Sequence, residues 1–295
     1  MRSIVLTLST VALLFFFALT ISSCQQEPGV DFTPPPVNDS AYLSMVVNID
    51  TTYPAGADTS TMDIITYDAQ KRVSRIDFYD YFLGTPGSGT LSNVFSFYYN
   101  GNDTLPYKVS EDWFGRSSFL FYENGIVVRD SMVFTDPGFL TFDKQIVTYT
   151  KLGGNRHRTV NNYTLNGVLV DTDTMYSVVT RNSFGEILNE KDTVYKSAGM
   201  TVLEFDLTYN TNPNPFLRLM VPYPVWGVDW SSPYAEWSLH NVASEYSFSR
   251  DESGAEQEIE YEMHYQYRAD GYPILKREYD DFGDMEKTYF YYKRL

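Results

Sequence analysis

Hydrophobic and polar residues alternate along most of the chain from residue 41 onward. The clearest case is 257–268, where one face is apolar and aromatic and the other is charged and polar. The first face holds Ile259, Tyr261, Met263, Tyr265 and Tyr267, and the second holds Glu258, Glu260, Glu262, His264, Gln266 and Arg268. A period of two is typical of a β-strand with one buried and one solvated face. A helix over the same residues would mix the two sets on every side.

The same alternation recurs over 200–209, and turn residues separate such segments at near-regular intervals. The turns include Asn100-Gly101, Phe114-Gly115, Asn124-Gly125, Pro137-Gly138, Gly153-Gly154-Asn155, Asn166-Gly167, Phe184-Gly185, Asp270-Gly271 and Phe282-Gly283. Asn-Gly and Asp-Gly supply the positive φ angles of tight hairpins. The spacing predicts an all-β, antiparallel up-and-down meander of about 14–16 strands, with no helix. Because open sheet edges promote aggregation, we expect it to curl into an open or closed barrel.

The predicted hairpins also resemble one another in sequence. Segments 65–73, 182–187, 265–274 and 279–285 share an aromatic or polar residue, an Asp or Asn turn, and a return to aliphatic residues. They look like the Tyr-Asp repeats of β-hairpin repeat proteins. One such hairpin cannot bury its apolar face alone, so each unit needs neighbours on both sides.

Residues 1–23 have the three parts of a secretory signal: Arg2, the uncharged apolar stretch 4–21, and small residues before Cys24. A transmembrane anchor is the alternative, because 18 apolar residues approach the ~20 that span a bilayer. The run Ile21-Ser22-Ser23-Cys24 resembles the lipobox of bacterial lipoproteins. That resemblance implies cleavage before Cys24 and its acylation with chains such as palmitate, which anchor stably when several are present.

The segment after Cys24 reads as a tether. Three consecutive prolines at 34–36 favour an extended polyproline spacer. The predicted organisation is a signal over 1–23, a lipidated Cys24 and Pro-rich tether over 24–40, and a single β-hairpin-repeat domain over 41–295. Ser40 follows Asp39 in a pattern that resembles the O-glycosylation acceptor motif of exported Bacteroidota proteins, so we expect it to be glycosylated.

The charge and the scarce Cys and His residues exclude several classes of function. The net charge is −16, which disfavours nucleic acid as a partner because phosphate binding needs a basic face. One Cys excludes an intramolecular disulfide and a Cys-based zinc site, and three His leave little for other metals. No catalytic signature is present, so the sequence predicts no catalytic residue, no metal site and no cofactor.

The best candidate for ligand binding is a cluster of three tryptophans, Trp226, Trp230 and Trp237, in a predicted long loop. Exposed aromatic rings can stack on sugars, and loops on a rigid β scaffold often carry function. The alternative is that these side chains fill one end of the barrel, because large aromatics bury well. We expect His240 to be a hydrogen-bond partner within a loop, and His264 to lie on a solvated strand face.

Residues 205–292 carry a more specific pattern: Asn212-Pro213-Asn214-Pro215-Phe216, then His240-Asn241, then Tyr265-Gln266-Tyr267-Arg268-Ala269-Asp270-Gly271-Tyr272-Pro273. This order resembles a family of Bacteroidota lipoproteins of unknown function with a porin-like, all-β fold. The resemblance implies that fold and an outer-membrane location, and it brings no catalytic residues.

These observations together predict a non-enzymatic binding or scaffold lipoprotein. It would be anchored to the outer membrane, on the cell surface or the periplasmic face, with a glycan or a protein as ligand. Two alternatives stay open. One is a glycosidase-like enzyme that uses two carboxyl groups, at least one with its pKa raised by burial. The other is a membrane-embedded barrel, against which charges on both faces of predicted strands argue, as at Arg129-Asp130 and Glu190-Lys191.

Overall fold

The computed structural model describes residues 42–50, 59–80, 89–113, 115–123, 126–135, 141–219, 238–280 and 283–295. They form strands and one short 3₁₀ helix. The elements are β1 (Tyr42–Asp50), β2 (Thr59–Tyr67), β3 (Val73–Asp80), β4 (Thr90–Tyr98), β5 (Lys108–Glu111), β6 (Arg116–Glu123), β7 (Ile126–Phe134), β8 (Lys144–Gly153), β9 (Arg156–Leu165), β10 (Val168–Arg181), β11 (Ile187–Lys196), β12 (Gly199–Pro213), η1 (Pro215–Leu219), β13 (His240–Arg250), β14 (Glu256–Tyr267), β15 (Pro273–Asp280) and β16 (Gly283–Lys293). Within this part of the chain no helix has the length and apolarity needed to cross a bilayer.

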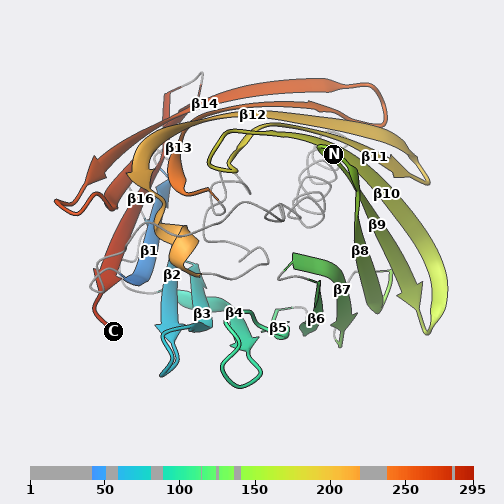
Figure 1. Cartoon of the computed structure of the whole chain (residues 1–295), viewed down its shortest axis with the longest axis horizontal. Coiled ribbons are helices and arrows are strands. Elements are labelled where there is room, and N and C mark those ends of the chain that lie inside the picture. The colour runs from blue at the N-terminus through green and yellow to red at the C-terminus, as the bar shows by residue number, and fades with distance from the viewer. Residues whose placement is uncertain are drawn as a thin grey trace.

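The sixteen strands form one closed antiparallel barrel in which each strand pairs with its sequence neighbours and β1 pairs with β16 (Figure 1). The predicted meander is therefore confirmed, in its closed form. Its one departure from the prediction is η1, which the alternation pattern did not indicate. Because β1 and β16 pair antiparallel, β1 begins and β16 ends at the same rim, with Tyr42 opposite Lys293. We call this rim the entry rim and the opposite one the far rim.

A five-residue turn recurs between strands and explains three of the sequence repeats, 65–73, 182–187 and 265–274. In 68–72, 182–186, 251–255 and 268–272, the first backbone N–H donates to the fifth carbonyl, and the fourth N–H donates to the first carbonyl. The fourth residue always has positive φ: 63° at Lys71, 83° at Gly185, 85° at Gly254 and 86° at Gly271. Glycine accepts this backbone without strain, which is why three of the four turns use it.

Six tyrosines on the inner surface tie neighbouring strands together at the entry rim. Each lies near the end of an even-numbered strand and donates its hydroxyl to a backbone carbonyl near the start of the preceding strand, at 2.6–2.9 Å. The pairs are Tyr67 to Leu43, Tyr99 to Val73, Tyr122 to Pro106, Tyr209 to Ile187, Tyr265 to Val242 and Tyr292 to Pro273. We call these six side chains the tyrosine girdle. Its members recur because the ends of β2, β4, β6, β12, β14 and β16 each contribute the same side chain at the same level.

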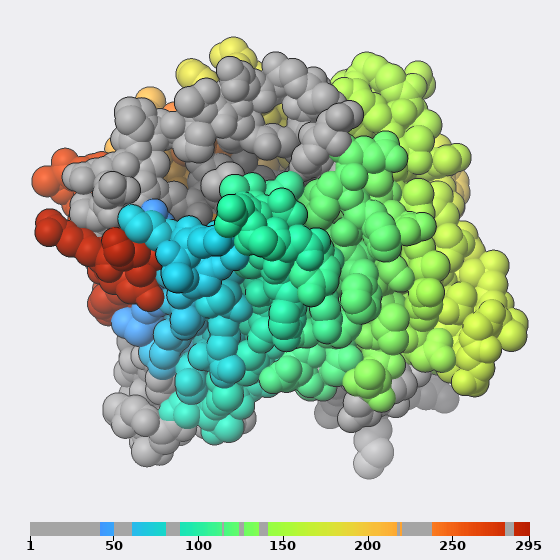
Figure 2. Space-filling model, turned by 60° about the horizontal axis from the view of Figure 1, so that its bottom comes forward, coloured from blue at the N-terminus to red at the C-terminus, as the bar shows by residue number. Residues whose placement is uncertain are grey.

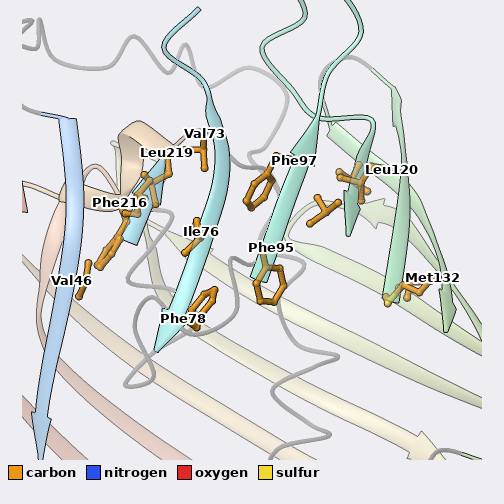
Figure 3. Packing of buried hydrophobic residues seen from close by; sticks show 14 of the residues in the cluster. Val46, Val73, Ile76, Phe78, Phe95, Phe97, Leu120, Met132, Phe216 and Leu219 are labelled. Atoms are coloured by element: carbon orange, nitrogen blue, oxygen red, sulfur yellow. The ribbon is translucent and has the colours of Figure 1, made fainter. Parts of the chain in front are cut away.

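The apolar core lines the inner face of the barrel in two clusters. The larger one lines β1–β9 with residues such as Val46, Ile76 and Phe95, and the smaller one lines β10–β14 around Val194 and Leu207. Helix η1 joins the larger cluster: Phe216 and Leu219 are buried beside Val46 (Figure 3), and the Phe216 ring meets the edge of Phe290 at 5.8 Å. Helix η1, which follows β12, therefore lies on the inner side of the barrel wall.

Candidate functional site

The segment between β12 and β13 is fixed at the entry rim by a buried network of polar groups. The backbone N–H of Asn214 donates to the Leu239 carbonyl at 3.0 Å, and Asn214 Nδ2 donates to Ser238 Oγ at 3.1 Å. Asn241 Nδ2 reaches the carbonyls of Asn212 and Pro213 at 3.2 and 3.1 Å. Asn214, Ser238 and Asn241 are all buried. The residues on either side of 220–237 are thus held together at the entry rim.

Glu186 and His240 form an acid–imidazole pair in the same network. Glu186 Oε1 accepts from the His240 backbone N–H and lies 2.9 Å from His240 Nδ1, while Oε2 accepts from Asn182 Nδ2 at 2.7 Å. The ring of Phe184 packs edge-on against the His240 ring at 5.3 Å. Among the described residues, the His240 ring hydrogen-bonds only to Glu186. The pair therefore connects the β10–β11 turn to the first residue of β13, and His240 acts as a hydrogen-bond partner.

Inward-facing carboxyl groups outnumber bases inside the described barrel. Eight acidic side chains on the strands are buried there, against two basic ones, Arg116 and Lys276. The acids are Asp63, Glu111, Asp130, Asp173, Glu190, Asp192, Glu245 and Glu278. Both bases are used in ion pairs, Arg116 with Glu111 at 3.0 Å and Lys276 with Glu278 at 3.1 Å. The interior therefore carries a surplus of acidic groups.

Burial perturbs several of these acids. It raises the pKa of Asp192 to about 6, although the neighbouring Ser177 and Glu190 side chains oppose the shift. It also raises the pKa of Asp63 well above its usual range, with the nearby carboxylates of Asp80 and Glu286 adding to the effect. Perturbed carboxyls can mark catalytic sites. Here Asp192 is 0% exposed and Glu190 4% exposed, so a polymeric substrate does not reach them.

All five residues that the sequence analysis named as sites lie outside the described residues. They are Cys24, Ser40, Trp226, Trp230 and Trp237. The structure describes only the two ends of the tryptophan segment, at Leu219 and Ser238. His264 does fall within a described strand, and its Nε2 lies 3.2 Å from Glu262 Oε1 with both side chains more than half exposed. This agrees with the expected solvated strand face.

Sequence reasoning missed the partners that fix the tryptophan segment. It singled out His240 and Asn241, but not Glu186, which is 54 residues from His240 in sequence. It also missed the tyrosine girdle as a structural unit. The available signal was the repeated Tyr before each Asp, Asn or Arg turn, which indicated a repeat but not a hydrogen bond across two strands.

No family model and no curated protein matches the chain. Solved structures are similar to it, among them two porin-like proteins. A porin-like protein from Bacteroides vulgatus ATCC 8482 superposes with a TM-score of 0.52 at 8% identity, covering 86% of this chain and all of that one. A porin-like protein from Bacteroides uniformis ATCC 8492 gives a TM-score of 0.49 at 11% identity, covering 87% of this chain and all of that one. At 8% identity the first likeness shows the fold alone: a porin-like, all-β barrel.

Proposed function

We propose that the protein is a lipid-anchored lipoprotein of the bacterial outer membrane whose barrel stands outside the bilayer and serves as a non-enzymatic binding or scaffold module. The leader over 1–23, the lipidated Cys24 and the tether over 25–40 supply the anchor in this proposal. The closed barrel is the rigid support, and the segment between β12 and β13 is the part it presents.

The observation that carries the proposal is the charge on the outside of the barrel. Near the middle of β11 and β12, Lys191 Nζ pairs with Glu204 Oε2 at 2.6 Å on the outer face. The outer face of β14 carries Glu258, Glu260 and Glu262, all exposed. A barrel inside a bilayer needs an apolar outer band, and a basic side chain at the midplane costs ~2–4 kcal/mol. A solvated outer surface accommodates these charges without that cost.

Fractionation of the whole protein without its anchor tests this proposal. Residues 1–23 are replaced by an ordinary cleavable export signal, together with Cys24→Ser. We expect the folded barrel in the soluble periplasmic fraction without detergent, while the native chain stays with the membrane. A barrel that remains in the outer membrane after a urea wash would instead be membrane-embedded, and the proposal would fail.

Binding is tested by thermal shift of the same soluble protein against polysaccharides, peptidoglycan fragments and outer-membrane peptides. A ligand present at 100 times its Kd stabilises the folded state by ~2.7 kcal/mol. We expect a shift that disappears in Trp226→Ala and in Trp230→Ala. Trp113→Ala is the matched control, because Trp113 is 59% exposed in the β5–β6 turn at the far rim. A shift that survives both segment variants would place the binding site elsewhere.

A further inference from the structure

The outer surface of the barrel is divided by charge. On β5–β9, the outward positions carry five basic residues: Lys108, Arg129, Lys144, Arg156 and Arg158. Their described outward positions hold one carboxylate, Glu123, at the entry-rim end of β6. We call the outer surface of β4–β9 the basic face. Figure 2 shows this side of the molecule, with β2 to β10 running across it.

Halfway round the ring from β6 lies β14, and we call the outer surface of β11–β14 the acidic face. Its outward residues include Glu258, Glu260 and Glu262, and β12 adds Glu204 and Asp206. The positive charges on this side are neutralised: Lys191 pairs with Glu204, and Arg250 pairs with Glu256 at 2.6 Å. The chain's charge of −16 is therefore not spread evenly over the barrel.

Two cations of the basic face, Lys108 and Arg129, lie beside aromatic rings. Arg129 is 3.8 Å from the centre of the Phe121 ring, and Lys108 is 5.0 Å from Tyr98 and 5.6 Å from Phe119. Among the described residues, neither Lys108 nor Arg129 forms an ion pair. The aromatic side chains remain 38–42% exposed. An unpaired cation beside an exposed ring offers both a charge and an apolar surface to a partner.

We propose that the basic face docks on an anionic membrane surface, so that the tethered barrel lies on its side against the bilayer that anchors it. This rests on the proposed lipid anchor. Phosphate headgroups match Lys108 and Arg129, and the interfacial region suits Phe119, Phe121 and Tyr98. A sugar ligand would need hydrogen-bonding carboxylates or amides around the rings. The described outward positions of the basic face offer only Glu123 and Asn162, and the Asn162 side chain already accepts from Thr172 Oγ1 at 3.1 Å.

The geometry permits this orientation. The tether enters at β1, three strands from β4, and the 17 residues 25–41 reach up to about 50 Å when extended. The acidic face is held on the far side of the barrel. Its repulsion from an anionic bilayer is screened, since the Debye length is about 8 Å at physiological ionic strength. Side-on docking would also keep both rims clear of the bilayer.

Vesicle binding by the unacylated protein tests the docking independently of the anchor. The chain from residue 24 with Cys24→Ser contains every strand pair of the barrel, so it carries the whole fold. Two double variants lower its charge equally: Lys108→Gln with Arg129→Gln on the basic face, and Lys191→Gln with Arg250→Gln on the acidic face. Arg250 is a matched control because it too lies near an aromatic ring, 5.7 Å from the centre of Phe248.

We expect wild type to sediment with phosphatidylglycerol-containing vesicles and not with pure phosphatidylcholine vesicles, and to be released by about 0.5 M NaCl. The basic-face double variant should bind roughly 30-fold more weakly, at ~1 kcal/mol per basic residue. The acidic-face double variant should bind as wild type or more tightly.

Equal weakening by both variants, no preference for anionic vesicles, or binding to soluble alginate in place of vesicles would each overturn the docking. Circular dichroism checks that both variants are folded. Loss of acylation at Cys24 in cells would refute the anchor and leave this result unchanged.

Discussion

Replacing Asp192 with asparagine should stabilise the barrel at neutral pH. Asp192 is fully buried on the inner face of β11, opposite Ser177 on β10 and on the same face as Glu190. Its folded pKa is about 6, against an ordinary value of 3.8. The folded state therefore binds the proton more tightly than the unfolded chain does. Stability from this group is present below about pH 4 and is lost as the pH rises through 6.

The size of the effect follows from the shift. A rise from 3.8 to about 6, at 1.36 kcal/mol per pKa unit, corresponds to about 3 kcal/mol. Asparagine keeps the shape of the side chain and carries no charge. Asp192→Asn should therefore raise the free energy of unfolding by about 3 kcal/mol at pH 7, by about half of that at pH 5, and by little below pH 4.

Urea unfolding of wild type and variant at several pH values between 3.5 and 8 measures this difference directly. Comparing the two proteins cancels other buried acids, such as Asp63, that also respond to pH. Asp206→Asn is the control: Asp206 is exposed on the outer face of β12, so its effect should stay within ~0.5 kcal/mol at every pH. A constant difference between Asp192→Asn and wild type across the pH range would refute the reasoning.

Three further changes test the structural roles assigned above. Tyr99→Phe removes a girdle hydroxyl and leaves the Val73 carbonyl without that donor, so it should lower the free energy of urea unfolding by about 1–2 kcal/mol. Tyr195→Phe, on the exposed outer face, should lower it by less than ~0.5 kcal/mol. Equal effects of the two changes would argue against the girdle. Lys71→Gly should raise the melting temperature, because a left-handed non-glycine residue costs ~1–2 kcal/mol, and a lower melting temperature would contradict this. Glu186→Gln should weaken the contact to His240 and speed limited proteolysis within 220–237. An unchanged rate of cleavage would show that Glu186 does not help to fix that segment.

Local patterning was sufficient to predict the strands of this barrel. The alternation over 257–268 places Tyr261 and Met263 inward and Glu260 and Glu262 outward on β14, as the structure confirms. The same holds for the charged pairs: Asp130 and Glu190 are buried, whereas their neighbours Arg129 and Lys191 are exposed. A period of two predicts the buried face correctly because each strand is solvated on one face only.

The closure of the barrel and the polar network at the entry rim could not be predicted from local patterning. The pairing of β1 with β16 joins residues nearly the whole chain apart, and no local pattern specifies it. The Glu186–His240 contact depends on how two turns meet at the entry rim. Asp192 follows the alternation, but its burial is a property of the closed barrel and not of its own segment. Sequence patterning specifies faces, whereas long-range contacts depend on the finished fold.

The pairing of β1 with β16 also sets the order in which the molecule can be completed. Ser44 Oγ donates to the Tyr291 carbonyl across 247 positions of sequence. Until the last hairpin is made, β1 and the newest strand are two open sheet edges, each able to pair with another chain. Contacts of such long range form slowly. The final 23 residues, 273–295, thus close the barrel. A chain that stops before them is left as an aggregation-prone open sheet.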